Sequence, residues 1–195
     1  MKRAFDILCS FVILILFFPF GVLIAIFVFC DSRGGVFYIQ ERIGKDEKPF
    51  GLIKFRTMFV NSEKEGKLTV GMNDRRITRI GSFLRRTKLD EFPQFLNVLI
   101  GEMSIVGPRP EIGEYVALYS DDQRKILEHK PGITDVASLE YYRENEILGA
   151  AENPEQKYIE EVMPAKIELN KKYLQNPSIG KDIAIILRTA IRMFR

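Results

Sequence analysis

The chain has 195 residues, of which 29 are Lys or Arg and 26 are Asp or Glu, so its formal net charge is +3. This length suits one ordinary domain, and the mixed charge excludes a protein whose main partner is duplex nucleic acid, which we therefore do not expect as a partner. With one histidine, His129, and two cysteines, the chain cannot form a four-cysteine zinc site, a zinc site of two cysteines and two histidines, or a disulfide framework.

The first predicted element is an apolar helix. Residues 7–30 contain no charged side chain, and as a straight helix they would measure about 36 Å, enough to cross a hydrocarbon core of about 30 Å. A cleaved signal peptide is disfavoured because the run is long and lacks a small-x-small site before Asp31. The pattern predicts a membrane segment at 1–31 and a domain outside the bilayer at 32–195.

Pro19 lies near the middle of the apolar run. It predicts a kink, because proline lacks the backbone N–H and clashes with the preceding turn. Two topologies stay open on physical grounds, a bent helix that spans the bilayer and a re-entrant helix that leaves on the side it entered. Basic residues flank the run on both sides, without a clear positive-inside asymmetry, and this suits the re-entrant form: Lys2, Arg3, Arg33, Arg42 and Lys45.

A small β-hairpin is predicted next, from β-leaning runs at 36–44 and 48–58 with turn residues between them. The polar, glycine-punctuated stretch 61–74 predicts a loop or lid. From Asp74 the pattern becomes helical, with an apolar stripe of Ile77, Ile80 and Leu84 among the densest arginines of the chain.

A further helix is predicted over 89–101, with Pro93 in its first turn. Asp90 and Glu91 would lie at its amino end, where acidic side chains commonly cap a helix, and Thr87 with Asp90 resembles a capping box. General propensities therefore favour capping. A functional interpretation rests on context, because arginines precede this pair and a GPRP motif follows it at 107–110.

Within that motif, Arg109 lies between two prolines, which restrict the backbone around a planar guanidinium suited to phosphate. An ordinary surface arginine in a structural loop is the equally weighted alternative. His129, beside the turn at Pro131 and Gly132, is more typical of a surface residue than of a catalyst.

The C-terminal third predicts scaffold helices and one amphipathic helix. A capped helix begins at Asn153, is expected to break at Pro164, and ends near Asn176. The last helix, 179–195, places a basic stripe (Lys181, Arg188, Arg192, Arg195) opposite an apolar one (Ile183, Ile186, Ala190, Phe194). Packing on the core and lying on an anionic membrane both fit this pattern. The predicted fold class is α/β, mostly helical with a small β-hairpin, a membrane-anchoring proline-broken helix and interfacial helices.

Four segments, taken together, closely resemble the bacterial sugar transferase family, the monotopic phosphoglycosyl transferases. They are KRAFDILCS at 2–10, KFRTM at 54–58, the run from RRTKLDEFPQ to GPRP at 85–110, and KPGIT at 130–134. The resemblance covers about residues 1–135, with the motifs in the family's order and spacing, and suggests the minimal catalytic form.

The resemblance implies a phosphoglycosyl transferase that moves a sugar 1-phosphate from a UDP-sugar to polyprenol (undecaprenyl) phosphate and releases UMP. This reaction begins glycan assembly at the cytoplasmic face of the bacterial inner membrane. Asp90 matches the family nucleophile that forms a covalent phosphosugar intermediate, and Glu91 matches a residue that supports metal or proton handling. Mg²⁺ is the implied cofactor, with Asp90 and Glu91 as its ligands.

Arg85 and Arg109 match positions that bind donor phosphates, Lys54 and Arg56 match the substrate-binding KFR motif, and Pro19 matches the proline of the re-entrant helix. Membrane lipid is an expected partner, and a homodimer is a candidate. A non-catalytic membrane-surface protein that binds a phosphate ligand, with Asp90 and Glu91 as helix caps, is the alternative; hydrolysis of the donor is a third.

The sequence departs from the family pattern after KPGIT. The common continuation is close to GWAQVNGR, whereas residues 135–143 read DVASLEYYR, with only Ala137 in register. The identity of the sugar therefore stays open. Phe92 and Glu102 replace the usual Leu and Asp, and these changes are mild.

Overall fold

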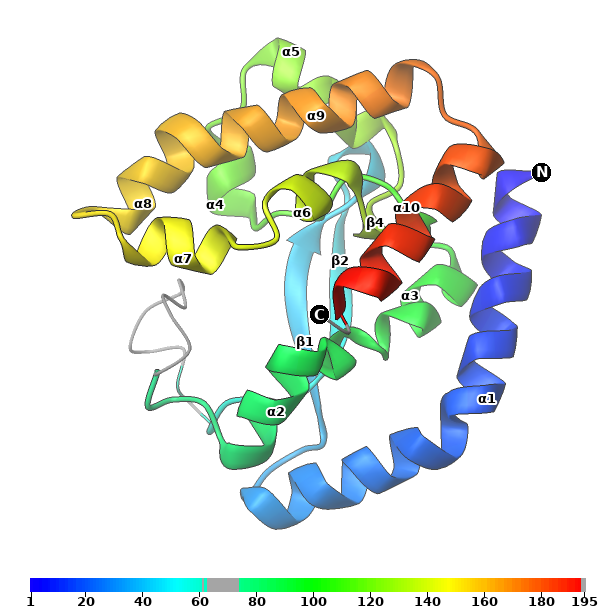
Figure 1. Ribbon diagram of the computed structural model, residues 1–195, viewed down its shortest axis with the longest axis vertical. Coiled ribbons are helices and arrows are strands. Elements are labelled where there is room, and N and C mark those ends of the chain that lie inside the picture. The colour runs from blue at the N-terminus through cyan, green and yellow to red at the C-terminus, as the bar shows by residue number, and fades with distance from the viewer. Residues whose placement is uncertain (61, 63–73, 194–195) are drawn as a thin grey trace.

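The computed structural model describes residues 1–60, 62 and 74–193 (Figure 1). The helices α1 to α10 cover Lys2–Asp31, Arg79–Thr87, Gln94–Ile100, Gly113–Val116, Asp121–Arg124, Val136–Glu140, Glu144–Gly149, Pro154–Lys157, Met163–Gln175 and Ile179–Met193. Short helical turns η1, η3, η4 and η5 cover Lys45–Glu47, Leu89–Glu91, Lys125–Glu128 and Tyr158–Val162, and strands β1 to β4 cover Phe37–Ile43, Pro49–Phe55, Ser104–Val106 and Gly132–Thr134. The predicted loop at 61–74 lies almost wholly outside the described residues.

The apolar run forms one helix, α1, whose ribbon bends sharply near its middle, as Pro19 predicts (Figure 1). Its most apolar 18-residue window has a mean hydropathy of 3.1 and is only 6% buried. By length and composition this helix is able to cross a membrane. Its two halves lie along two sides of the rest of the molecule rather than in one line (Figure 1).

The predicted β-hairpin is confirmed. Strands β1 and β2 pair antiparallel, with Tyr38 opposite Lys54 and Arg42 opposite Phe50. Because side chains alternate across a strand, this register puts Arg42 and Lys54 on the same face of the hairpin.

A second, parallel pair of strands, β3 and β4, departs from the prediction, since the KPGIT pattern indicates a turn alone. The two chains approach very closely there. A Cβ atom on Gly132 would lie 2.1 Å from the backbone nitrogen of Gly107, so no side chain fits between the KPGIT and GPRP motifs. This contact positions the loop that carries Arg109.

Helix α2 begins later than predicted, at Arg79, because the Thr78 hydroxyl caps it by accepting from the N–H of Gly81 at 2.9 Å. It ends at Thr87 and is followed by the C-cap Lys88, which has a left-handed backbone (φ 58°) and whose N–H bonds to carbonyls of the last turn. The chain then turns through η3 before α3 begins.

The capping prediction for Asp90 is wrong. Neither η3 nor α3 has a side-chain cap, and the Thr87 hydroxyl donates back to the carbonyls of Phe83 and Leu84 instead of forming a capping box. The reversal at Lys88 separates α2 from η3, and Asp90 is buried within the domain rather than placed over free N–H groups.

The predicted break at Pro164 is also wrong. Asn153 caps α8 as expected, but the helix continues through the π-helical turn η5 into α9, with Pro164 in the first turn of α9. The wider turn accommodates the missing N–H of proline without interrupting the helix. The predicted end near Asn176 is confirmed.

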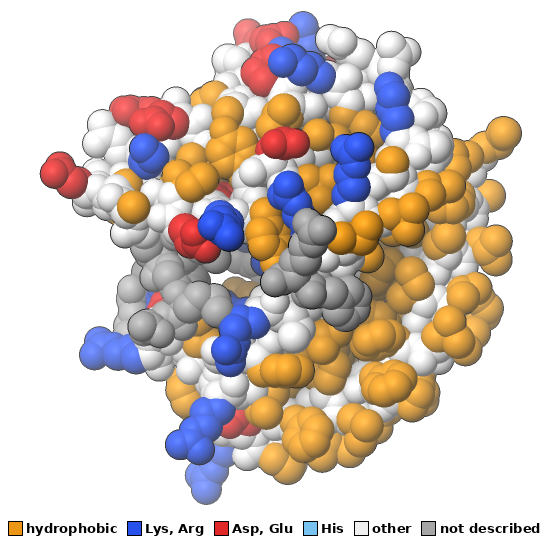
Figure 2. All heavy atoms as spheres, in the orientation of Figure 1, with side chains coloured by type: hydrophobic (Ala, Val, Ile, Leu, Met, Phe, Trp, Pro, Cys, Tyr) orange, Lys and Arg blue, Asp and Glu red, His pale blue; other side chains and the backbone are white. Residues whose placement is uncertain are grey.

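Helix α10 uses one face for the core and presents another to solvent. Asp182 and Ile185 are buried, and the Thr189 hydroxyl bonds to that of Thr134. Three apolar side chains on a different face are exposed by 43–57%: Ile183, Leu187 and Ile191. The packed face is therefore shifted around the helix from the predicted apolar stripe, for which packing and membrane binding were both open. Phe194 and Arg195 lie outside the described residues. Figure 2 shows hydrophobic side chains gathered over α1 and the region of α10.

Candidate functional site

Three predicted residues from separate elements meet at one carboxylate. Arg109, in the loop after β3, donates through Nη2 to Glu91 Oε1 at 2.5 Å. The Nζ of Lys54, near the end of β2, lies 3.8 Å from the same oxygen. Glu91 itself belongs to η3, so the hairpin, the helical turn and the GPRP loop together build this cluster.

The neighbouring carboxylate, Asp90, lies in a different environment from Glu91. It is 8% exposed, and its Oδ1 atom is buried without a hydrogen-bond partner in the part of the chain that the structure describes. A buried polar atom left unpaired costs free energy, and a catalytic role or a bound ion or water is among the explanations for it. Glu91 is paired with cations, whereas one carboxylate oxygen of Asp90 is buried and has no hydrogen-bond partner among the described residues.

The two carboxyl groups have opposite pKa shifts. Burial raises the pKa of Asp90, and the negative charge of Glu91 raises it further, against the pull of nearby cations. For Glu91 burial acts in the same upward direction, but Arg109, Lys54 and Lys88 outweigh it and lower its pKa. Glu91 is thus the more acidic member of the pair, and the proton affinity of Asp90 is raised.

The surrounding cations are also perturbed. Burial lowers the pKa of Lys54 to about 8, even though Glu91 favours its charged form. The pKa of Arg109 is raised, chiefly by Glu91, so this guanidinium stays charged. Burial lowers the pKa of Arg85, and the negative charge of Asp90 acts in the opposite direction. The Arg85 Nε donates to the Thr57 hydroxyl at 2.9 Å. Positive charge therefore surrounds the Asp-Glu pair.

Two predicted residues lie elsewhere. The Arg56 guanidinium donates to the carbonyls of Ser32 and Arg33, both at 2.7 Å, where α1 joins the domain. Pro19 lies within α1. The structure thus brings together Lys54, Arg85, Asp90, Glu91 and Arg109, and it gives Arg56 a tethering position; a role for Arg56 in binding substrate stays a prediction.

Two further cations were missed from sequence. Lys88 precedes the pair in a left-handed conformation that non-glycine residues rarely adopt, and its charge acts on both carboxyl groups. Arg42 donates to the Pro110 carbonyl at 3.2 Å, next to Arg109. Arg42 could have been found from strand alternation. It lies four residues after Tyr38, on the same face of β1, and Tyr38 pairs with Lys54, so Arg42 and Lys54 share a face of the hairpin.

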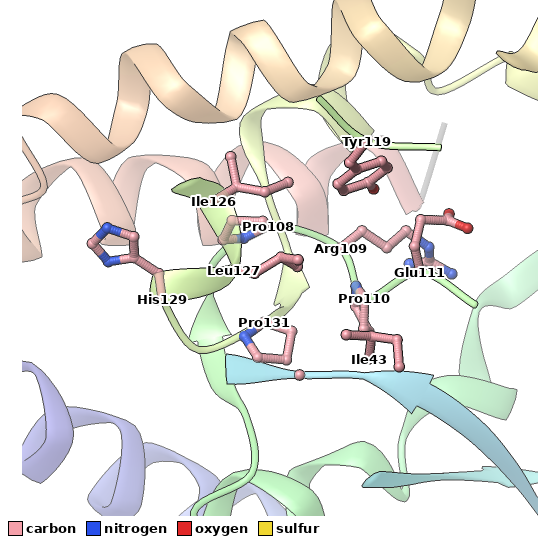
Figure 3. Close-up of a pocket in the computed structure, with 11 residues that line it drawn as sticks. Ile43, Pro108, Arg109, Pro110, Glu111, Tyr119, Ile126, Leu127, His129 and Pro131 are labelled. Carbon is pink, nitrogen blue, oxygen red and sulfur yellow. The ribbon is translucent and has the colours of Figure 1, made fainter. Parts of the chain in front are cut away.

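A cavity of about 10 Å³ lies beside the GPRP loop, with Arg109 and Glu111 on one side and His129 on the opposite side (Figure 3). It has room for about one water molecule and not for a nucleotide sugar. A wider groove of about 310 Å³ is lined by residues of η1, α5 and η4, and none of the predicted site residues borders it.

The described residues form no cluster of three or more His, Cys, Asp or Glu side chains that would hold a metal ion alone. Magnesium often binds through one or two carboxylates and completes its shell with water and substrate phosphates. The unpartnered Oδ1 of Asp90 is a suitable oxygen donor for such an ion. The residues present therefore fit a magnesium ion that is shared with a phosphate ligand.

This geometry defines a class of site in which two adjacent carboxylates, one buried and one partly buried, lie among cations that suit phosphate, in a chain that also carries a long apolar helix. A family model described as bacterial sugar transferase matches residues 1–195. The chain belongs to the bacterial sugar transferase family.

Individual relatives agree with this assignment. A UDP-glucose:undecaprenyl-phosphate glucose-1-phosphate transferase of Klebsiella pneumoniae is 40% identical over 99% of this chain and 40% of its own length. The UDP-N-acetylgalactosamine-undecaprenyl-phosphate N-acetylgalactosaminephosphotransferase of Aeromonas hydrophila is 34% identical over 97% of this chain and 42% of its own. The exopolysaccharide production protein ExoY of Rhizobium meliloti is 32% identical over 96% of this chain and 83% of its own. The chain thus spans about two fifths of the first two relatives.

Proposed function

We propose that this chain is a phosphoglycosyl transferase that moves a sugar 1-phosphate from a UDP-sugar to undecaprenyl phosphate and releases UMP. The observation that carries the proposal is the buried, unpartnered Oδ1 of Asp90 within a group of cations. The family membership and the names of the relatives support the same reaction. Their names differ in the sugar, so the sugar is left open.

In the first half-reaction, a carboxylate oxygen of Asp90 attacks the phosphorus that bears the sugar. The new Asp90–phosphorus bond forms as the bond to the UMP oxygen breaks, and UMP leaves with that electron pair. In the second, a phosphate oxygen of the acceptor attacks the same phosphorus, which restores the Asp90 carboxylate. A carboxylate is a weak nucleophile, so cations must neutralise the phosphate oxygens and hold the attack in line.

In this proposal Asp90 and Glu91 have different roles because they have different contacts. Arg109 and Lys54 hold Glu91 and remain close enough to meet donor phosphates, whereas Asp90 keeps an oxygen for the reaction. Magnesium, held by Asp90 and by Glu91, would neutralise charge on the donor diphosphate. The absence of side-chain capping by Asp90 argues against the alternative in which this pair only caps a helix.

The proposal includes a re-entrant topology for α1, because both ends of this helix bind the same domain. At its start, Arg3 donates to the carbonyls of Val98 and Leu99 at 2.6 and 3.0 Å. Asp6 accepts from the Ser104 hydroxyl at 2.7 Å. At its end, Asp31 accepts from the N–H of Ile80 at 2.9 Å. A helix that crossed the bilayer would separate these two ends by the hydrocarbon thickness.

This arrangement suits a lipid acceptor at the cytoplasmic face of the bacterial inner membrane. The exposed side chains of Ile183, Leu187 and Ile191 form a stripe on α10, and basic Arg188 and Arg192 lie on a neighbouring face. Such a helix suits the boundary between lipid and water. The acceptor keeps its tail in the hydrocarbon and its phosphate near the site.

The test is a turnover assay with the full chain in vesicles that contain undecaprenyl phosphate. A panel of UDP-sugars is offered with magnesium, and UMP and the lipid product are measured. We expect UMP release that requires magnesium and acceptor, with sugar phosphate attached to the lipid. Free sugar phosphate without lipid product would identify hydrolysis instead, and no UMP from any donor would overturn the proposal.

A further inference from the structure

Arg42, Glu111 and Tyr158 form a polar network with the loop that carries Arg109. Arg42 donates through Nη1 to the carbonyl of Pro110 at 3.2 Å and lies 3.7 Å from Glu111 Oε2. The Tyr158 hydroxyl donates to the other oxygen of Glu111 at 2.7 Å. Glu111 directly follows Pro110 and is drawn beside Arg109 in Figure 3.

The backbone adds a further link. The N–H of Ile43, next to Arg42, donates to the carbonyl of Glu111 at 2.8 Å, which joins the loop to the end of β1. Both prolines of the motif already limit rotation around Arg109. The side chain and the backbone of Glu111 are therefore both fixed, two residues beyond the guanidinium that contacts Glu91.

The charges explain why this network matters. Arg42 and Arg109 are close enough for each to disfavour the other's charge, and burial lowers the pKa of Arg42. Burial and the charge of Arg109 both lower the pKa of Arg42, and the Glu111 carboxylate raises it, which favours the charged form of Arg42. The Glu111 side chain is only 14% exposed, and the Tyr158 hydroxyl supplies a hydrogen bond to this partly buried carboxylate.

Tyr158 opens the π-helical turn η5, and such turns are frequent at functional sites. The ammonium group of Lys166 lies 5.6 Å from the centre of the Tyr158 ring and bonds to Glu144 at 2.7 Å. The ring is thus held from the α9 side while its hydroxyl points to Glu111. A residue fixed in this way is a rigid support for the loop.

We propose that Arg42, Glu111 and Tyr158 are positioning residues that hold Arg109 in the orientation that binds the diphosphate of the donor. The inference rests on the proposed function, in which Arg109 binds donor phosphate. It assigns a role to three residues that contact neither carboxylate of the Asp-Glu pair. Their loss is expected to weaken donor binding and to leave the chemical steps intact.

The first experiment compares two hydroxyl deletions within one core cluster. Tyr158→Phe removes the bond to Glu111, whereas Tyr115→Phe is a matched control, because its buried ring packs 5.1 Å from that of Tyr158. We expect Tyr158→Phe to raise the KM for the UDP-sugar about tenfold, the effect of one lost charge-assisted hydrogen bond, with kcat within about twofold. Tyr115→Phe should leave both constants within about twofold of wild type. An equal response of the two variants would overturn the inference.

The second experiment asks whether the effect passes through Arg109. Binding of UDP with magnesium, which needs no turnover, is measured for wild type, Tyr158→Phe, Arg109→Ala and the double variant. A positioning role predicts that Tyr158→Phe weakens binding only while Arg109 is present, so the two effects are not additive. Additive effects would overturn the inference and indicate a general structural role.

These outcomes separate the inference from the proposed function. If wild type releases UMP and Arg109→Ala weakens UDP binding, while Tyr158→Phe matches wild type, the positioning role alone fails. If wild type neither binds UDP nor releases UMP, the proposed function fails, and the positioning role fails with it.

Discussion

Asp90 and Glu91 are adjacent in sequence, yet Arg109 lies 2.5 Å from Glu91 while the Oδ1 atom of Asp90 is buried without a partner among the described residues. The backbone turn of η3 sends the two side chains into different surroundings. Glu91 is paired directly with protein cations, whereas cations act on Asp90 without a hydrogen bond to its Oδ1 atom. The following predictions test this difference.

Asp90→Asn should abolish turnover and preserve the fold. Asparagine has nearly the same shape but cannot form the phosphosugar bond, so kcat should fall at least about a thousandfold. The thermal midpoint should not fall, because the change removes a buried charge that has an unpaired oxygen. Mass spectrometry of wild type mixed with donor alone should find a phosphosugar on the peptide that contains residue 90. An active wild type without this adduct would contradict the assignment.

Glu91→Gln should lower stability, because it leaves Arg109 and Lys54 without the charge that they share. The Arg109 and Glu91 side chains are 34% and 13% exposed, so the expected loss is about 2 kcal/mol, between the values for an exposed and a buried ion pair. Glu161→Gln is the matched control, since Glu161 is an exposed carboxylate with a 3.2 Å contact to Lys157, and should cost less than about 1 kcal/mol. Chemical unfolding of both variants measures the difference, and equal losses would refute the prediction.

The rate should fall at both ends of the pH range. In the proposed reaction Asp90 attacks as a carboxylate, so its raised pKa predicts that activity declines on acidification at a higher pH than for an ordinary aspartate. In the same proposal Lys54 binds phosphate in its charged form, so its pKa of about 8 predicts that donor binding weakens as the pH rises through that value. Lys54→Arg should move the alkaline limb upward, because arginine stays protonated. A limb that does not move would exclude Lys54 as its origin.

The re-entrant topology proposed for α1 predicts that its two ends are accessible from one side of the membrane. In a background where Cys9 and Cys30 are replaced by Ser, single cysteines at Lys2 and Ser32 should react with an impermeant thiol reagent only when it is offered from the cytoplasmic side. Pro19→Ala should restore the missing hydrogen bond and favour a straighter helix. Labelling of the two positions from opposite sides would establish a spanning helix.

The sequence predicted the elements whose signal is local. The hairpin at 36–58 and the cap at Asn153 followed from alternation and capping chemistry, and both are present. The gathering of Lys54, Arg85 and Arg109 around the Asp-Glu pair was available only through the resemblance, because these residues come from different elements. Spacing along the chain carries no direct information about such contacts.

The errors arose where one tertiary or backbone feature overrode a local preference. Asp90 has the sequence context of a helix cap, but the left-handed residue Lys88 turns it into the domain. Pro164 normally ends a helix, but the π-helical turn before it absorbs the lost bond. The parallel pairing of β3 with β4 depends on two glycines far apart in sequence, and no local pattern reveals it.

The tether at Arg56 has a consequence for which acceptors can react. Lys54 and Arg56 are two residues apart, so an extended backbone separates them by about 7 Å. Lys54 contacts Glu91, and Arg56 donates hydrogen bonds to the carbonyls of Ser32 and Arg33 just after the end of α1. If the proposed function holds, the depth at which α1 is immersed sets the height of the reacting phosphorus above the bilayer. A lipid phosphate raised on a long water-soluble spacer should then be a poor acceptor, although its chemistry is unchanged.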